Sequence, residues 1–293
     1  MNILLVGGLG YIGTYLNEYL VNLGLVVDIC DHSKSLNSRS NINIKYPYNY
    51  SGLTAKDLAQ YDCILWFAGH SSVSESNSDP IGALNNNMIN LIDFLKKIPN
   101  ENTLFIYAST ASLYTGVEGP SKEDAKVVPY ENAYDISKFA FDYLAPRFHK
   151  KIIGLRMGTL SGYSVKMRPE LIFNSMMLSA YFNGEVKVAN KEKIRSILFL
   201  SDLAEIVKIL LTTNISSFGF YNASSYTFKI GEISEKISHH ANVKVIELPK
   251  SDTYSFSIDN SKIQTLGFKN TFSFMEQMEK FIEDIKNANY TQK

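Results

Sequence analysis

The chain opens with a short apolar run that leads directly into a glycine-rich loop. Ile3–Val6 is followed by Gly7, Gly10 and Gly13, and an amphipathic stretch begins near Tyr11. In a strand–loop–helix unit, Gly7 allows a tight turn, Gly10 lets the backbone approach a ligand, and Gly13 packs the helix on the strand. The helix N-terminus offers unpaired N–H groups and partial positive charge to a phosphate. The opening therefore predicts a dinucleotide-binding unit.

A second apolar run indicates which dinucleotide is bound. Leu25–Cys30 is followed by Asp31, about 20 residues after the glycine loop. In dinucleotide-binding units, a carboxylate at this position accepts hydrogen bonds from the adenosine ribose. Because Asp31 would repel a 2′-phosphate, the sequence favours NAD(H) over NADP(H).

Composition excludes several other classes of protein. The 293 residues have room for one such domain and a smaller lobe, and 29 basic residues balance 29 acidic ones. Without a basic cluster, a nucleic acid or an anionic membrane is not expected as a partner. The sequence shows no bilayer-spanning stretch and no basic signal-peptide start, so we expect a cytoplasmic location. Cys30 and Cys63 are expected to be reduced core residues, and no metal site is expected.

Apolar runs alternate with helical patterns through the first half of the chain. The predicted strands are Ile3–Val6, Val26–Cys30, Ile42–Lys45, Cys63–Phe67, Leu104–Ala108 and Ile152–Arg156. The predicted helices are Tyr11–Asn22, Leu84–Lys97 and Ala133–Phe148. This alternation predicts an α/β fold with a Rossmann-type, doubly wound parallel sheet.

The pattern changes after about residue 162. Helices are predicted near Glu170–Asn183, Ser201–Thr213 and Ile230–Ala241, with strands at Glu185–Val188 and Lys244–Leu248. We therefore expect an NAD-binding domain over residues 1–160, with later crossover segments at about 195–225. Residues 161–293 are expected to form mainly a smaller C-terminal α/β substrate lobe.

Three residues carry the predicted chemistry. Thr110 follows the predicted strand Leu104–Ala108, and Tyr134 and Lys138 stand about 20 residues later. At i and i+4 on a helix, Tyr134 and Lys138 share one face. A phenol with a pKa near 10 is a poor base, but a nearby ammonium and the positive nicotinamide stabilise its phenolate. We expect hydride transfer between a secondary alcohol and nicotinamide, with Tyr134 exchanging the hydroxyl proton and Thr110 orienting the reacting oxygen.

Taken together, these motifs resemble the extended short-chain dehydrogenases/reductases of the nucleotide-sugar epimerase/dehydratase group, and most closely the UDP-galactose 4-epimerase pattern. The resemblance implies the catalytic residues Thr110, Tyr134 and Lys138. It implies a cofactor site made of Gly7, Gly10, Tyr11, Ile12, Gly13, Asp31, Phe67, Ala68, Gly69, Asn87, Ala108, Ser109, Tyr134 and Lys138. It implies substrate contacts at Ser71, Thr110, Thr159, Asn174 and Arg195, the last two at the diphosphate.

Departures from the family pattern narrow the expected chemistry. Ser71 stands where many 4-epimerases have lysine, Thr159 replaces an asparagine, and Phe199 replaces a histidine. The strand-three aspartate that holds the adenine has no clear counterpart, and Asn49 is a possible substitute. Dehydratases of the group carry Asp-Glu directly after the catalytic threonine, where this chain has Ala-Ser at 111–112, so 4,6-dehydration is not expected.

The leading hypothesis is an NAD-dependent nucleotide-sugar 4-epimerase that works through a transient 4-keto sugar. The alternative is a nucleotide-sugar 4-ketoreductase that uses NADH. A non-catalytic NAD-binding regulatory protein would typically have lost the Tyr/Lys pair. The sequence identifies neither the sugar nor the nucleotide.

The resemblance further implies a homodimer, in which the helices near Leu84–Lys97 and Ala133–Phe148 pair as a four-helix bundle. Apolar residues on these helices support it, because they cover more than one face. They are Leu84, Met88, Leu91, Ile92, Leu95, Phe139, Phe141, Tyr143 and Leu144.

Overall fold

Two groups of elements, each with its own core, make up the chain. The computed structural model describes residues 1–32, 44–129 and 132–291. The N-terminal unit comprises residues 1–113, 127–156 and 210–221, and the C-terminal unit comprises residues 114–126, 157–209 and 222–293. Each unit is described by itself below.

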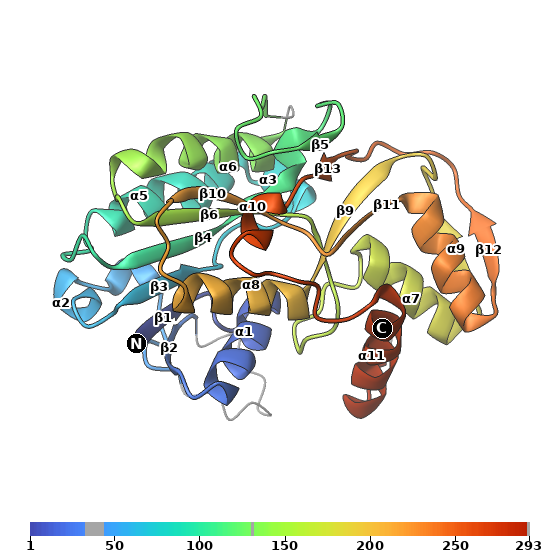
Figure 1. Cartoon of the computed structure of the whole chain (residues 1–293), viewed down its shortest axis with the longest axis horizontal. Helices are drawn as coiled ribbons and strands as arrows, with labels where there is room; N and C mark the ends of the chain where they lie inside the picture. Colours follow the sequence, from blue (N-terminus) through green and yellow to red (C-terminus); the bar gives the residue numbers. More distant parts are fainter. Residues whose placement is uncertain (33–43, 130–131, 292–293) are drawn as a thin grey trace. The chain divides into compact units, whose positions relative to one another are not determined.

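The N-terminal unit is built on a six-stranded sheet with the order β10-β6-β4-β3-β1-β2 (Figure 1). Its strands are β1 (Asn2–Val6), β2 (Val26–Cys30), β3 (Cys63–Trp66), β4 (Leu104–Thr110), β6 (Ile152–Met157) and β10 (Gly219–Ala223). β1 pairs in parallel with both β2 and β3, and β3 pairs in parallel with β4. The strand order therefore reverses between β1 and β3, which is where doubly wound sheets bind their ligands. The predicted Rossmann-type fold is confirmed.

Helices cover both faces of this sheet. Figure 1 shows α1 on one face and α5 and α6 on the other. The helices of this part are α1 (Tyr11–Asn22), α2 (Ala55–Leu58), α3 (Val73–Ser78), α4 (Pro80–Leu84), α5 (Asn90–Leu95) and α6 (Ala133–Leu144), while α8 (Leu200–Thr212) has residues in both units. Trp66 is central in the core, with its ring 4.7 Å from Phe94 and 6.1 Å from Phe105.

Two predicted elements of this unit differ from the structure. The predicted helix Leu84–Lys97 is interrupted, because Asn85–Ile89 forms a π-helical turn between α4 and α5. Three consecutive asparagines have low helix propensity and form side-chain hydrogen bonds, which disturbs the regular ladder. Of the predicted strand Ile42–Lys45, the first two residues lie outside the described residues and the last two form no strand; the next residue, Tyr46, forms an isolated bridge with Cys30.

The C-terminal unit contains three small sheets, with orders β11-β9-β7, β12-β8 and β13-β5. The strands are β5 (Pro120–Ser121), β7 (Thr159–Ser161), β8 (Glu185–Val188), β9 (Ile194–Phe199), β11 (Tyr226–Lys229), β12 (Lys244–Glu247) and β13 (Ser257–Ile258). The helices are α7 (Ile172–Asn183), α9 (Ile230–Ala241), α10 (Ser261–Gln264) and α11 (Phe274–Asn287). The ring of Phe173 forms edge contacts with Phe199 at 4.8 Å and Phe281 at 5.6 Å, which ties α7 to β9 and α11.

Three general expectations can be compared with this structure. Cys30 and Cys63 are buried free thiols, and burial raises the pKa of Cys30 to about 12. Within the described ranges, no cluster of three or more His, Cys, Asp or Glu side chains could hold a metal ion. None of the helices described is long and apolar enough to cross a membrane.

Candidate active site

The glycine loop lies at the carboxyl ends of β1 and β3. Gly7 has a φ of +83°, and a Cβ at this position would lie 2.6 Å from the backbone nitrogen of Ala68. A Cβ on Gly13 would lie 2.2 Å from the carbonyl oxygen of Gly7, whereas one on Gly10 would meet only that same oxygen, at 3.3 Å. Side chains are therefore excluded at Gly7 and Gly13, and the backbone at Gly10 is left open to a phosphate beside α1. Tyr11 and Ile12 begin that helix.

Asp31 is tied to this loop. Its Oδ2 accepts a hydrogen bond from the backbone N–H of Leu9 at 2.8 Å, and its Oδ1 accepts one from His32 at 2.7 Å. The carboxylate thus lies directly after β2 and next to the glycine loop, which is the placement that ribose recognition requires.

Asn87, in the π-helical turn Asn85–Ile89, supplies a buried acceptor beside the loop that follows β3. It is 1% exposed, and its Nδ2 donates to the His70 carbonyl at 3.2 Å and to Ser137 Oγ at 3.0 Å. Its Oδ1 has no hydrogen-bond partner among the described residues. A Cβ on Gly69 would lie 2.4 Å from that oxygen, so glycine is required beside it. An orphaned buried acceptor fits a bound hydroxyl donor, such as a cofactor ribose.

Lys138 is buried beneath Tyr134 on α6. Its Nζ donates to the Ala108 carbonyl at 2.9 Å and lies 6.0 Å from the centroid of the Tyr134 ring. Burial lowers the pKa of Lys138 from 10.5 to about 8, against the opposing attraction of Asp142. The structure therefore places Tyr134 and Lys138 on one helix face, as their spacing predicts.

Thr110, the third residue expected to be catalytic, is the last residue of β4 and is 7% exposed.

A second charged group beside Lys138 was not anticipated. Asp142 accepts hydrogen bonds from the Tyr107 hydroxyl at 2.8 Å, from Ser109 Oγ at 2.9 Å and from Arg156 Nε at 3.3 Å. Burial raises the pKa of Asp142, and Arg156 and the two hydroxyls oppose this shift. Ser109, which we expected at the cofactor, therefore has its hydroxyl engaged with Asp142. The i+4 spacing of Asp142 from Lys138 was the available signal.

A hydroxyl–carboxylate chain on the Thr110 side was also missed. Thr110 Oγ1 lies 2.7 Å from Ser112 Oγ, which donates to Asp135 Oδ1 at 2.5 Å. Asp135 is the third residue of α6, whose N-cap is Asn132. The Asn-x-x-Asp spacing indicates such a capped helix start, but it does not indicate the contact with Ser112.

The residues expected at the substrate have varied surroundings. Ser71 is exposed in the loop after β3. In the C-terminal unit, Thr159 is half-buried at the start of β7. Asn174 is fully buried in α7, where its Oδ1 accepts from the Gly162 N–H at 2.9 Å and its Nδ2 donates to the Arg168 carbonyl at 3.0 Å. Asn174 therefore holds the segment between β7 and α7 in place.

Arg195 on β9 is a buried cation. It is 5% exposed, and its Nη2 donates to Thr253 Oγ1 at 2.8 Å and to the Tyr254 carbonyl at 2.7 Å. Burial lowers the pKa of Arg195 to about 10, and its Nε has no hydrogen-bond partner in the part of the chain that the structure describes.

Fold and site together define a dinucleotide-binding protein with the tyrosine–lysine pair of the short-chain dehydrogenase/reductase class. The chain belongs to the NAD dependent epimerase/dehydratase family, which it matches over residues 3–224. The cofactor of this family is NAD, and the glycine loop, Asp31 and the orphaned Asn87 oxygen fit it. When bound, NAD supplies a hydride acceptor that can return the hydride.

Individual relatives show how far the similarity extends. The chain is 31% identical over 163 residues to UDP-glucose 4-epimerase of Yersinia enterocolitica, a match that covers 50% of this chain and 48% of the relative. It is 25% identical to ADP-L-glycero-D-manno-heptose-6-epimerase of Brachyspira hyodysenteriae over 92% of this chain and 93% of the relative. The chain thus spans about half the length of the first of these relatives and nearly all of the second.

A solved structure supports the fold over the full chain. UDP-glucuronic acid 4-epimerase from Bacillus cereus, in complex with UDP-glucuronic acid and NAD, superposes with a TM-score of 0.82 at 22% identity. The match covers 98% of this chain and 100% of that one. At this identity the likeness shows the fold alone.

Proposed function

We propose that the protein is an NAD-dependent nucleotide-sugar 4-epimerase. The observation that carries the proposal is the juxtaposition of the Tyr134 ring with the buried Lys138 ammonium on α6, in a family of NAD-dependent enzymes. A protein that only senses NAD has no need of this pair or of Thr110. The epimerases among the relatives support epimerisation over reduction.

Each catalytic side chain has a distinct task in this proposal. Tyr134 takes the carbinol proton as hydride leaves C4 of the sugar, and it returns the proton to the oxygen of the 4-keto intermediate. Lys138 stabilises the Tyr134 phenolate, because its ammonium lies beside the ring. Thr110 hydrogen-bonds the reacting oxygen and holds it against Tyr134. Return of the hydride to the opposite face of the rotated keto sugar completes the inversion.

We propose that Arg195 binds the diphosphate of the substrate. Its guanidinium carries a positive charge that no described carboxylate neutralises, and its Nε is an unused donor. A guanidinium fork matches phosphate oxygens, which would supply both the charge and the acceptor. Asn174 would contribute by holding the adjoining backbone rather than by offering a free amide.

A test separates this function from its alternatives. Purified protein is incubated with UDP-glucose, UDP-galactose and UDP-glucuronic acid without added cofactor, and the sugars are separated by chromatography. An epimerase with retained NAD converts a sugar to its 4-epimer. Consumption of added NADH with a 4-keto sugar, and no epimerisation, would establish the ketoreductase instead. Binding of NAD without turnover of any nucleotide sugar would indicate a regulatory protein.

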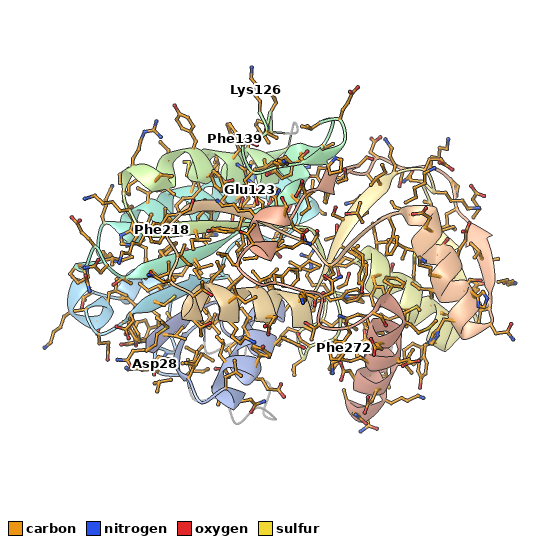
Figure 2. The ribbon with its side chains drawn as sticks, in the orientation of Figure 1. Asp28, Glu123, Lys126, Phe139, Phe218 and Phe272 are labelled. Atoms are coloured by element: carbon orange, nitrogen blue, oxygen red, sulfur yellow. The ribbon has the colours of Figure 1, made fainter. Side chains whose placement is uncertain are left out.

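We also propose a homodimer that pairs α4, α5 and α6 with those of a second copy. Leu91 and Leu95 pack in the core and are not available for pairing. On these helices and the turn between α4 and α5, the described large apolar side chains that are exposed are Ile81 (73%), Tyr143 (61%), Ile136 (45%) and Ile89 (43%). Phe139, labelled in Figure 2, lies one turn of α6 beyond Ile136. Light scattering should give twice the 33.0 kDa chain mass, and a monomer mass would reject the dimer.

A further inference from the structure

Two buried side chains, Asp135 and Ser112, connect the N-terminal end of α6 to Thr110. The oxygens of Thr110 and Ser112 are 2.7 Å apart, and Ser112 donates to Asp135 at 2.5 Å. The backbone N–H of Ser112 also donates to Thr110 Oγ1 at 3.2 Å. Thr110 and Ser112 are 7% and 5% exposed, and Asp135 is fully buried. Bulk water therefore does not compete for these hydrogen bonds.

Hydrogen-bond donors and a helix N-terminus surround the Asp135 carboxylate. The Asp135 N–H donates to Asn132 Oδ1 at 2.9 Å, which orients the Asn132 amide so that its Nδ2 donates to Asp135 Oδ2 at 2.9 Å. Ser112 donates to the other carboxylate oxygen. Full burial favours the neutral acid, whereas the two donors and the N-terminal end of the helix favour the negative charge.

An ionised Asp135 fixes the direction of the whole chain. A carboxylate only accepts, so the single proton of Ser112 points to Asp135. Ser112 Oγ must then accept at its contact with Thr110, and the Thr110 hydroxyl must donate. With its proton committed to Ser112, Thr110 Oγ1 can offer a bound substrate only a lone pair.

We propose that Asp135 is a positioning residue that, through Ser112, makes Thr110 a hydrogen-bond acceptor toward the carbinol of the bound sugar. This proposal rests on the proposed function. As an acceptor, Thr110 Oγ1 can hold the O–H of the carbinol. The O–H then turns to Tyr134 and loses its proton, and the carbinol becomes a ketone. Thr110 can give no hydrogen bond to the oxygen of that ketone. The chain therefore favours the alcohol over the ketone and keeps the 4-keto sugar short-lived.

The substitution Asp135→Asn should reverse the chain. The asparagine nitrogen cannot face the Asn132 Nδ2, because two donors would meet, so it faces Ser112. Ser112 then donates to Thr110, whose proton is released toward the substrate oxygen and stabilises the ketone. We expect turnover to fall about fivefold to tenfold, the scale of one hydrogen bond. The steady-state fraction of NADH, followed by its absorbance, should rise about threefold on the same scale.

The proposal requires that the effects of Asp135→Asn on turnover and NADH accumulation depend on the Thr110 hydroxyl. In a Thr110→Val background, Asp135→Asn should change neither turnover nor NADH accumulation further. Asp57→Asn is the matched control, since Asp57 is also the third residue of a capped helix and accepts from Thr54. It should leave both readouts unchanged. Unchanged NADH accumulation in Asp135→Asn, or an equal effect without the Thr110 hydroxyl, would overturn the proposal.

A measurement without turnover separates this proposal from the proposed function. Because the Ser112–Asp135 hydrogen bond is buried and its acceptor is a carboxylate, it should give a slowly exchanging, downfield hydroxyl proton in the NMR spectrum. We expect this resonance in the wild type and in Thr110→Val, and its loss in Ser112→Ala and Asp135→Asn. Its absence from the wild type would overturn the direction of the chain whatever the enzyme turns over. Its presence in a protein that turns over no nucleotide sugar would support the chain and overturn the proposed function.

Discussion

The two units bury positive charge in different ways. In the N-terminal unit, Arg156 lies 3.3 Å from Asp142, whose carboxylate also attracts the Lys138 ammonium. In the C-terminal unit, Arg195 is buried to a similar degree, but it donates only to the neutral Thr253 hydroxyl and Tyr254 carbonyl among the described residues, and it lies 5.1 Å from the centroid of the Phe256 ring. No described carboxylate pairs with it. A buried charge without a partner costs stability. We therefore expect Arg156 to stabilise the fold, whereas we have proposed that Arg195 binds the substrate diphosphate.

The largest expected effect concerns proton transfer in the N-terminal unit. Tyr134→Phe keeps the ring but removes the ionisable hydroxyl, so we expect kcat to fall by about 10²–10⁴-fold. NAD binding and folding should change little. Steady-state assays and an NAD titration check both. Tyr181→Phe is the control, because Tyr181 lies on α7 of the C-terminal unit and is 42% exposed. If Tyr134→Phe kept more than about a tenth of the activity, the assignment would be wrong.

The next prediction tests the buried ion pair between Arg156 and Asp142. Arg156→Met leaves the buried Asp142 without its ion-pair partner and with only the Lys138 ammonium nearby. Breaking such a buried pair costs about 3–5 kcal/mol. The free energy of unfolding from urea titration should fall by this amount at neutral pH. At acidic pH the loss should shrink, because a protonated Asp142 no longer needs the cation. A variant as stable as the wild type at neutral pH would show that the pair does not support the fold.

The same substitution in the other unit should have the opposite effect on stability. Arg195→Met removes a buried charge that has no counter-ion, so Tm should stay the same or rise. The affinity for UDP should fall roughly tenfold to a hundredfold, as expected for losing a charge-assisted hydrogen bond. Calorimetric titration with UDP measures the affinity, and thermal melting measures Tm. Lower stability with unchanged UDP affinity would make Arg195 structural and remove the contrast between the units.

The smallest expected effect is a shift of the pH profile. Lys138 is protonated below its pKa of about 8 and neutral above it. Because the ammonium stabilises the Tyr134 phenolate, log kcat should decline above this pH. The Asp142 carboxylate raises the pKa of Lys138, so Asp142→Asn should move the alkaline limb to lower pH, whereas Asp93→Asn, on the exposed side of α5, should not. A limb that stays in place or moves to higher pH would disconnect Asp142 from Lys138.

Short-range patterns in the sequence predicted most of the nucleotide-binding half. The glycine loop and α1 follow from Gly7, Gly10 and Gly13, and the pairing of Tyr134 with Lys138 follows from helical periodicity. These features depend on residues at most a few positions apart, whose backbone preferences act locally. The π-helical turn at Asn85–Ile89 was the exception, since a run of asparagines weakens a helix without indicating which turn will widen.

Only the tertiary structure decided which distant side chains meet. Ser112 and Asp135 are 23 positions apart, and Arg195 and Thr253 are 58 apart. No periodicity relates such positions, because their contact depends on where a whole strand and a whole helix pack. The sequence by itself therefore determined the NAD-binding fold and the tyrosine–lysine pair. Burial and long-range contacts decided which charges are compensated, which carboxylate meets the Thr110 and Ser112 hydroxyls, and, among the described residues, which buried arginine nitrogen has no hydrogen-bond partner.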